Sequence, residues 1–125
     1  MSTVMIVDDA DLARATLGRL LQREGYHTVM ATNGRDALSV LKTQHEPDLI
    51  LLDLNMPDLD GLELLEILHA HPKWQSIPVI MLTAVSDTHT VHRAHQLGAK
   101  EYLVKAAFSV RDMLHHVKMY TGQTH

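Results

Sequence analysis

Two kinds of hydrophobic pattern alternate along the chain. In the first, apolar residues form short continuous runs, clearest at Val4–Val7, Leu49–Leu52 and Val79–Leu82 and weaker at His27–Ala31 and Tyr102–Val104. Uninterrupted runs of this length predict strands that are covered on both faces, as in a parallel sheet.

The segments between these runs carry apolar residues at helical spacing, which predicts helices with one buried face. Polar residues that favour helix N-caps stand at the start of four of them: Asn33, Asp60, Ser86 and Ser109. Strand and helix therefore alternate five times. This alternation predicts an α/β fold with a parallel sheet and right-handed crossovers.

Composition narrows the class of protein. The chain has 125 residues, of which 46% are hydrophobic and 21% charged, and it has no linker-like segment, so we expect one domain over residues 1–125. Its net charge of −4 argues against direct nucleic-acid binding. The absence of cysteine excludes disulfides, thiolate metal sites and cysteine nucleophiles. The sequence shows neither a signal peptide nor a membrane-spanning stretch, so we expect no membrane partner and a cytoplasmic location.

Reactive side chains gather where the predicted strands end. Asp8 and Asp9 follow the first strand, Asp53 the third, Thr83 the fourth and Lys105 the fifth. Ligands of open α/β sheets bind beyond the carboxyl ends of the strands, so we expect these five side chains to share one crevice. Each alone is more often a cap, a turn former or a solvated charge. Their joint placement is what indicates a functional site.

The residue types in this crevice suit phosphoryl chemistry. Three crowded carboxylates repel one another unless a cation lies among them. A set of oxygen ligands suits a hard ion such as Mg²⁺, which combines one or two carboxylates with a phosphate oxygen. One carboxylate can act as a nucleophile and form an aspartyl phosphate. The Lys105 ammonium and the Thr83 hydroxyl can bind the phosphoryl oxygens.

Four short segments at these strand ends form motifs. The most specific is Asp53–Gly61, which reads Asp-Leu-Asn-Met-Pro-Asp-Leu-Asp-Gly, and the others are Val7–Asp9, Leu82–Ala84 and Leu103–Lys105. Together they resemble the response-regulator receiver domains of two-component signalling, and the chain is similar in size to the single-domain chemotaxis regulators. The resemblance implies a flavodoxin-like (βα)5 fold whose five-stranded parallel sheet has the order 2-1-3-4-5.

The resemblance also implies an acceptor and a metal site. Asp53 is the expected phosphoacceptor, and a histidine kinase or phosphotransfer protein is the expected donor. The expected ligands of Mg²⁺ or Mn²⁺ are Asp8, Asp9, Asp53 and the backbone carbonyl of Asn55. The chain is then a signalling switch and not an enzyme, because its only chemistry is phosphorylation of itself and slow loss of that group.

The expected switch residues surround the acceptor. Thr83 and Lys105 are expected to bind phosphoryl oxygens, Ala84 to leave room for the phosphodonor, and Tyr102 to move inward with Thr83. The resemblance places the output surface on the fourth helix, fifth strand and fifth helix. A downstream protein, or a second copy after phosphorylation, is the expected partner there.

One position departs from the family pattern. The family usually has a cis proline after the lysine, whereas Ala106 follows Lys105 here. A cis bond before a residue other than proline costs about 3–4 kcal/mol. We therefore predict a trans bond and a rearranged loop before the fifth helix.

Three other functions fit parts of the sequence. A phosphohydrolase with an aspartate nucleophile usually needs a second aspartate two residues later, where this chain has Asn55. A flavodoxin-like cofactor binder would want Ser, Thr or Gly after the first strand, in place of the acidic segment Asp8–Asp11. A degenerate receiver acting as a passive scaffold would not require all five strand-end residues.

Two other features have weaker functional interpretations. His89, His92 and His95 recur every three residues on the predicted fourth helix, but this spacing drifts around a helix and favours a solvated, pH-sensitive surface over a zinc site. Trp74 precedes the fourth strand, and we expect it to pack at the surface.

Overall fold

Five strands and five helices alternate in the computed structural model, which describes residues 2–44, 46–107 and 109–122. In chain order they are β1 (Thr3–Val7), α1 (Asp11–Arg23), β2 (His27–Ala31), α2 (Gly34–Thr43), β3 (Leu49–Leu52), α3 (Gly61–Ala70), β4 (Val79–Thr83), α4 (Thr88–Gln96), β5 (Glu101–Val104) and α5 (Val110–Thr121). All pairs of neighbouring strands are parallel, and the sheet order is β2-β1-β3-β4-β5. The predicted flavodoxin-like fold is confirmed. None of these helices combines the length and the hydropathy that a bilayer-spanning segment needs.

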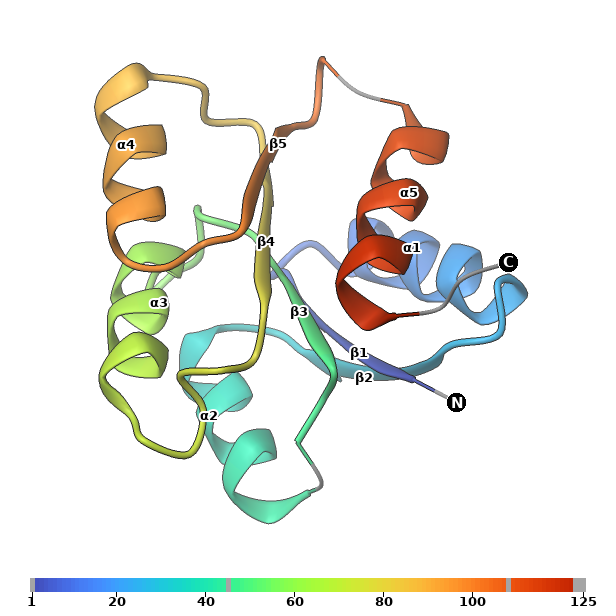
Figure 1. Ribbon diagram of the computed structural model, residues 1–125, viewed down its shortest axis with the longest axis horizontal. Helices are drawn as coiled ribbons and strands as arrows, with labels where there is room; N and C mark the ends of the chain where they lie inside the picture. Colours follow the sequence, from blue (N-terminus) through green and yellow to red (C-terminus); the bar gives the residue numbers. More distant parts are fainter. Residues whose placement is uncertain (1, 45, 108, 123–125) are drawn as a thin grey trace.

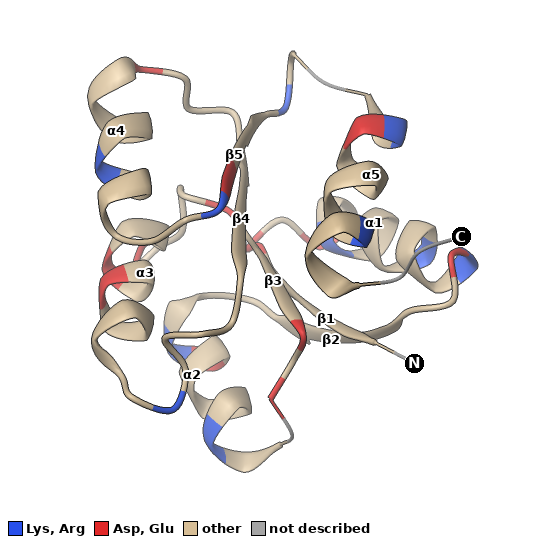
Figure 2. Cartoon of the chain, viewed as in Figure 1, with Lys and Arg blue, Asp and Glu red and all other residues tan. Residues whose placement is uncertain are grey.

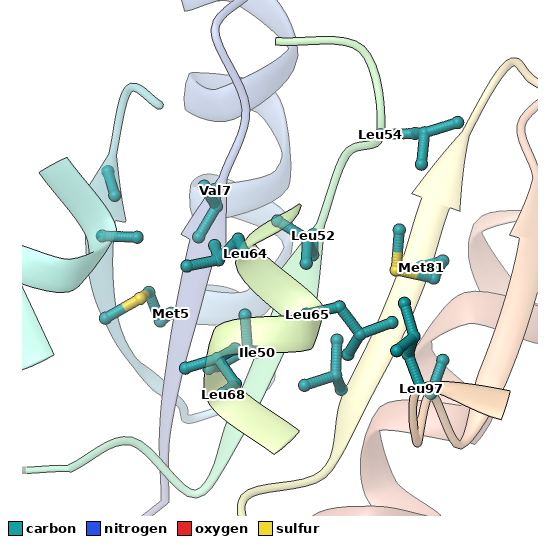
Figure 3. Packing of buried hydrophobic residues seen from close by; sticks show 14 of the residues in the cluster. Met5, Val7, Ile50, Leu52, Leu54, Leu64, Leu65, Leu68, Met81 and Leu97 are labelled. Carbon is teal, nitrogen blue, oxygen red and sulfur yellow. The ribbon is translucent and has the colours of Figure 1, made fainter. Parts of the chain in front are cut away.

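Helices cover both faces of the sheet, so the molecule has three layers (Figure 1). On one face α1 and α5 contribute Leu21 and Met113 to a cluster with inward-facing residues of β1, β3, β4 and β5. On the other face α2 and α3 pack Leu41 and Leu64 against the sheet, and Leu97, which follows the last residue of α4, belongs to the same cluster. Figure 3 shows Leu64 and Leu97 in this cluster. Every residue of the central strand β3 is buried. This burial on both faces explains why the strands read as continuous apolar runs.

Three of the four predicted N-caps are confirmed. The side chains of Asn33, Asp60 and Ser109 each accept a hydrogen bond from the backbone amide three residues later. The N-cap of α4 is Asp87, so the prediction of Ser86 was wrong by one residue. The Asp87 carboxylate accepts bonds from both the amide and the hydroxyl three residues later, which makes it the stronger cap.

Trp74 is buried, so its predicted surface position was wrong. It lies in the connection between α3 and β4, only 4% of it is exposed, and it belongs to the core beneath α3 and α4. Its ring stacks on His71, with ring centroids 3.8 Å apart. Apolar periodicity cannot show this burial, because the segment forms neither helix nor strand.

Candidate functional site

The register of the sheet brings the strand-end residues to one edge. Asp8 and Asp53 follow residues that are paired with each other in β1 and β3. Thr83 pairs with the residue immediately before Lys105. Parallel strands present their carboxyl ends at the same edge, so residues from four strands meet there.

Three carboxylates form a cluster at this edge. One oxygen from each of Asp8, Asp9 and Asp53 lies within 4.8 Å of the others. Asp8 and Asp53 are buried, with 1% and 9% exposure, whereas Asp9 is exposed to solvent. Across residues 2–44, 46–107 and 109–122 this is the only such group of three or more acidic, histidine or cysteine side chains. The histidines of α4 therefore do not form a comparable site.

Lys105 and two local contacts hold Asp8 in place. The Lys105 Nζ donates to Asp8 Oδ2 at 3.4 Å, across the sheet from β5 to β1. The Ala10 amide donates to Asp8 Oδ1 at 2.9 Å, and Arg14 Nη1 donates to the Asp8 carbonyl at 2.7 Å. The cluster thus has one lysine facing its carboxylates and one arginine supporting its backbone.

The Asp53 carboxylate lies where its negative charge is poorly compensated. Burial raises the pKa of Asp53 above its ordinary value, and the nearby charge of Asp8 raises it further. The Lys105 ammonium, the Thr83 hydroxyl and the Leu54 amide, which donates to Asp53 Oδ1 at 2.8 Å, only partly offset this shift. A divalent cation would supply the missing positive charge, so the donor set fits a hard ion such as Mg²⁺.

The other predicted residues surround the cluster without joining it. Thr83 is fully buried, and its hydroxyl accepts a bond from the Val85 amide at 3.3 Å. Asn55 and Ala84 are exposed, in the connections that follow β3 and β4. The Tyr102 hydroxyl donates to the Val85 carbonyl at 2.7 Å. The tyrosine is therefore anchored to the connection between β4 and α4 and not to the carboxylates.

Arg14 belongs to the site although its sequence position did not single it out. Its side chain is 15% exposed and also forms an ion pair with Asp11, three residues earlier on α1. This spacing is the available sequence signal, because residues three apart on a helix are neighbours. The contact with the Asp8 carbonyl depends on how the chain enters α1, which the spacing does not reveal.

The peptide bond after Lys105 is trans, as predicted, because no peptide bond of the described residues is cis. The Ala107 amide donates to the Val104 carbonyl at 2.9 Å and closes a turn just beyond β5. Lys105 still reaches Asp8, so alanine in place of the family's proline leaves the lysine beside the carboxylates. The predicted rearrangement of this loop includes Phe108, which lies outside the described residues.

Without divalent ions, replacing Asp53 by Asn should stabilise the fold at neutral pH. The pKa of Asp53 is raised in the folded chain, so the folded state binds this proton more tightly than the unfolded state. The resulting stability is fully present below the ordinary Asp pKa of about 3.9 and is lost as the pH rises through the raised value. In EDTA, Asp53→Asn should need more urea to unfold than wild type at pH 7, and this difference should shrink towards pH 4.

Asp87→Asn is a control whose effect on stability at pH 7 should be opposite to that of Asp53→Asn. Hydrogen bonds from the Thr90 amide and hydroxyl lower the pKa of the exposed Asp87 carboxyl. Its stabilisation is therefore present above the ordinary Asp pKa and lost as the pH falls through the lowered value. This variant should be less stable than wild type at pH 7. If Asp53→Asn is no more stable than wild type at pH 7, then the Asp53 carboxylate is not destabilised by burial and by the Asp8 charge as described above.

Known proteins resemble this chain in sequence and in fold. Residues 4–118 match the response regulator receiver domain family. The chain is 35% identical over 120 residues to the polar-differentiation response regulator DivK of Brucella anthropi, a match that covers 96% of each protein. The solved structure of the chemotaxis protein CheY4 of Vibrio cholerae is similar, with a TM-score of 0.87 at 28% identity over 96% of this chain and 98% of that one. The Mn²⁺-bound form of the response regulator Rcp1 has a TM-score of 0.79 at 27% identity over 98% of this chain and 91% of that one.

The family match and the similarity to DivK extend over nearly the whole chain, and the sheet order agrees with them. Receiver domains act with histidine kinases or phosphotransfer proteins and are switches, not enzymes that turn over an external substrate. The chain belongs to the response regulator receiver domains, the phosphorylation-dependent switches of two-component signalling systems.

Proposed function

We propose that Asp53 accepts the phosphoryl group. The observation that carries this proposal is the position of its carboxylate, which is 9% exposed and lies among Asp8, Asp9 and the lysine that pairs with Asp8. Burial and the Asp8 charge raise the pKa of Asp53, so they destabilise its ionised form. A nearby cation would stabilise the ionised carboxylate, and it would also bind the phosphoryl group once that group is attached. Asp9 is more exposed and Asp8 is held by Lys105 and the Ala10 amide, which leaves Asp53 as the best nucleophile.

The same proposal assigns a metal site to this cluster. Asp8, Asp9, Asp53 and the carbonyl of Asn55 would hold Mg²⁺ or Mn²⁺, which when bound neutralises the charge of the incoming phosphoryl group. Rcp1, a protein of the same fold, has a solved Mn²⁺-bound form. The chain's own contribution is to hold Asp8 rigidly, through contacts to both its carboxylate and its carbonyl.

Four residues would have roles around the phosphoryl group. Lys105 and Thr83 would bind its oxygens, and Ala84, which has no side chain beyond Cβ, would leave the approach open. Tyr102 would respond when Thr83 moves, because both contact Val85 through hydrogen bonds. Self-phosphorylation and slow self-dephosphorylation would be the only reactions of this single domain.

The partners proposed follow from these roles. The donor would be a histidine kinase or phosphotransfer protein, and the reader of the signal would bind the face formed by α4, β5 and α5. Phosphorylation-dependent pairing of two copies through that face would be a second output. The expected cytoplasmic location stays a prediction, which cell fractionation would test.

The first test is the intact mass of the chain after incubation with acetyl phosphate. With Mg²⁺ we expect the mass of one added phosphoryl group, removable by hydroxylamine as an acyl phosphate should be, and with EDTA we expect none. A phosphorylated histidine kinase should give the same product faster.

The outcomes separate the rival functions. Continuous release of phosphate, with little stable phosphoprotein, would favour a phosphohydrolase. No added mass from either donor would favour a passive scaffold and would overturn the proposal.

A further inference from the structure

An open apolar groove adjoins the carboxylate cluster. It lies between α1 and α5, has a volume of about 450 Å³ and is lined mainly by aliphatic side chains. Leu12 and Val110 stand at its rim with 77% and 49% exposure, high for such residues, while Leu82 and Met113 are buried. This volume lies in the range of small-molecule sites, which are mostly apolar with a few polar groups.

One residue belongs to both the groove and the cluster. Lys105 lines the groove and donates to Asp8 at 3.4 Å. Among the described residues, the only other polar residue that lines the groove is Thr16. A molecule whose phosphoryl group lies at Asp53 could therefore pass Lys105 and extend an apolar tail between α1 and α5.

The helices that form the groove are basic, although the whole chain has a net charge of −4. Basic side chains outnumber acidic ones on both helices (Figure 2). They are Arg14, Arg19, Arg23, Arg111 and Lys118, against Asp11 and Asp112. None of these five lines the groove, where Lys105 is the only charged side chain among the described residues. An anion with an apolar tail therefore complements the Lys105 ammonium and the aliphatic lining.

We propose that the groove selects small phosphodonors by their acyl group, so that acyl phosphates with apolar chains phosphorylate this protein more efficiently than acetyl phosphate. This inference rests on the proposed function of Asp53. In the reaction an Asp53 oxygen forms a bond to phosphorus, and the bond from phosphorus to the acyl oxygen breaks. The acyl group leaves as a carboxylate with the electron pair of that bond, and no proton or further reactant is required.

Butyryl phosphate against acetyl phosphate is the matched comparison, because acetate and butyrate are leaving groups of almost equal basicity. Any difference therefore reports contact with the chain and not intrinsic reactivity. A fully buried methylene improves binding about fourfold, and two half-buried ones should lower the half-saturating concentration by about fourfold in total. The measurement is the rate of phosphoprotein formation by intact mass, with Mg²⁺, over a range of donor concentrations.

Two sets of substitutions test whether the preference for butyryl phosphate arises in the groove. Leu12→Ser with Val110→Ser should bring the ratio of the two half-saturating concentrations close to one, since both side chains stand at the rim of the groove. Met119→Ser is the matched control: it removes a 54% exposed apolar side chain of α5 that does not line the groove, and it should leave the ratio unchanged.

A second readout does not depend on phosphorylation. Butylphosphonate, an unreactive analogue, should shift the methyl NMR signals of Leu12 and Val110, whereas methylphosphonate should not. Equal half-saturating concentrations in wild type, or a ratio that survives loss of both rim side chains, would overturn the inference while leaving the acceptor role of Asp53 intact. Failure of every donor to phosphorylate the chain would overturn the proposed function and this inference with it, even if the methyl signals shift.

Discussion

Replacing Asp53 by Asn should abolish phosphorylation of the chain, from one phosphoryl group per molecule to none. The amide keeps the shape of the side chain and can still accept the Leu54 amide bond, but it lacks the charge needed to attack phosphorus. It also removes the negative charge of one of the three carboxylates whose oxygens lie within 4.8 Å of one another. The measurement is the intact mass after incubation with acetyl phosphate and Mg²⁺.

Asp58→Asn is the matched control for this experiment. Asp58 lies in the same connection between β3 and α3, but its side chain is 63% exposed and pairs with Arg35. Its φ of 72° is in the left-handed region, which Asn adopts readily, so the exchange should not strain the backbone. This variant should gain the phosphoryl group as wild type does. A hydroxylamine-labile group on the Asp53→Asn protein would move the acceptor to Asp8 or Asp9.

The position of the candidate site could be predicted because it follows from topology. Continuous apolar runs predict buried parallel strands, and parallel strands place their carboxyl ends together. Asp8, Asp53, Thr83 and Lys105 each follow or end such a run, so their proximity needed no knowledge of side-chain packing. The fold was predictable for the same reason, because the fold and the position of the site both depend only on the order and type of the strands and helices.

The hydrophobic pattern could not predict features that depend on a single residue or on irregular backbone. Ser86 and Asp87 are both good N-caps, and only the bonds between Asp87 and Thr90 decide which one starts α4. The burial of Trp74 and the bond from Arg14 to the Asp8 carbonyl arise from the path of connecting segments. Sequence periodicity carries no signal for that path.

Replacing Gly61 by Ala should destabilise the fold by about 1–3 kcal/mol, the usual cost of overpacking. A Cβ at this position would lie 2.4 Å from the Asp53 carbonyl oxygen and 2.8 Å from the Leu54 Cα, and both are backbone atoms that cannot rotate away. The Gly61 amide also donates to the Leu54 carbonyl at 2.9 Å, and Asp60 caps the helix that begins here. The start of α3 must therefore move away from the end of β3. Urea denaturation at neutral pH measures the loss of unfolding free energy.

The effect of Gly61→Ala should extend to the chemistry, because the displaced backbone carries the acceptor. We expect slower phosphorylation by acetyl phosphate under conditions in which the variant is still folded. Gly25→Asn is the control: Gly25 has a φ of 92° and open space where a Cβ would lie, and Asn tolerates the left-handed region. That variant should keep the wild-type phosphorylation rate. An unfolding free energy for Gly61→Ala within about 0.5 kcal/mol of wild type, the range of ordinary surface substitutions, would mean that the turn from Asp53 to Gly61 is not packed as tightly as its distances indicate.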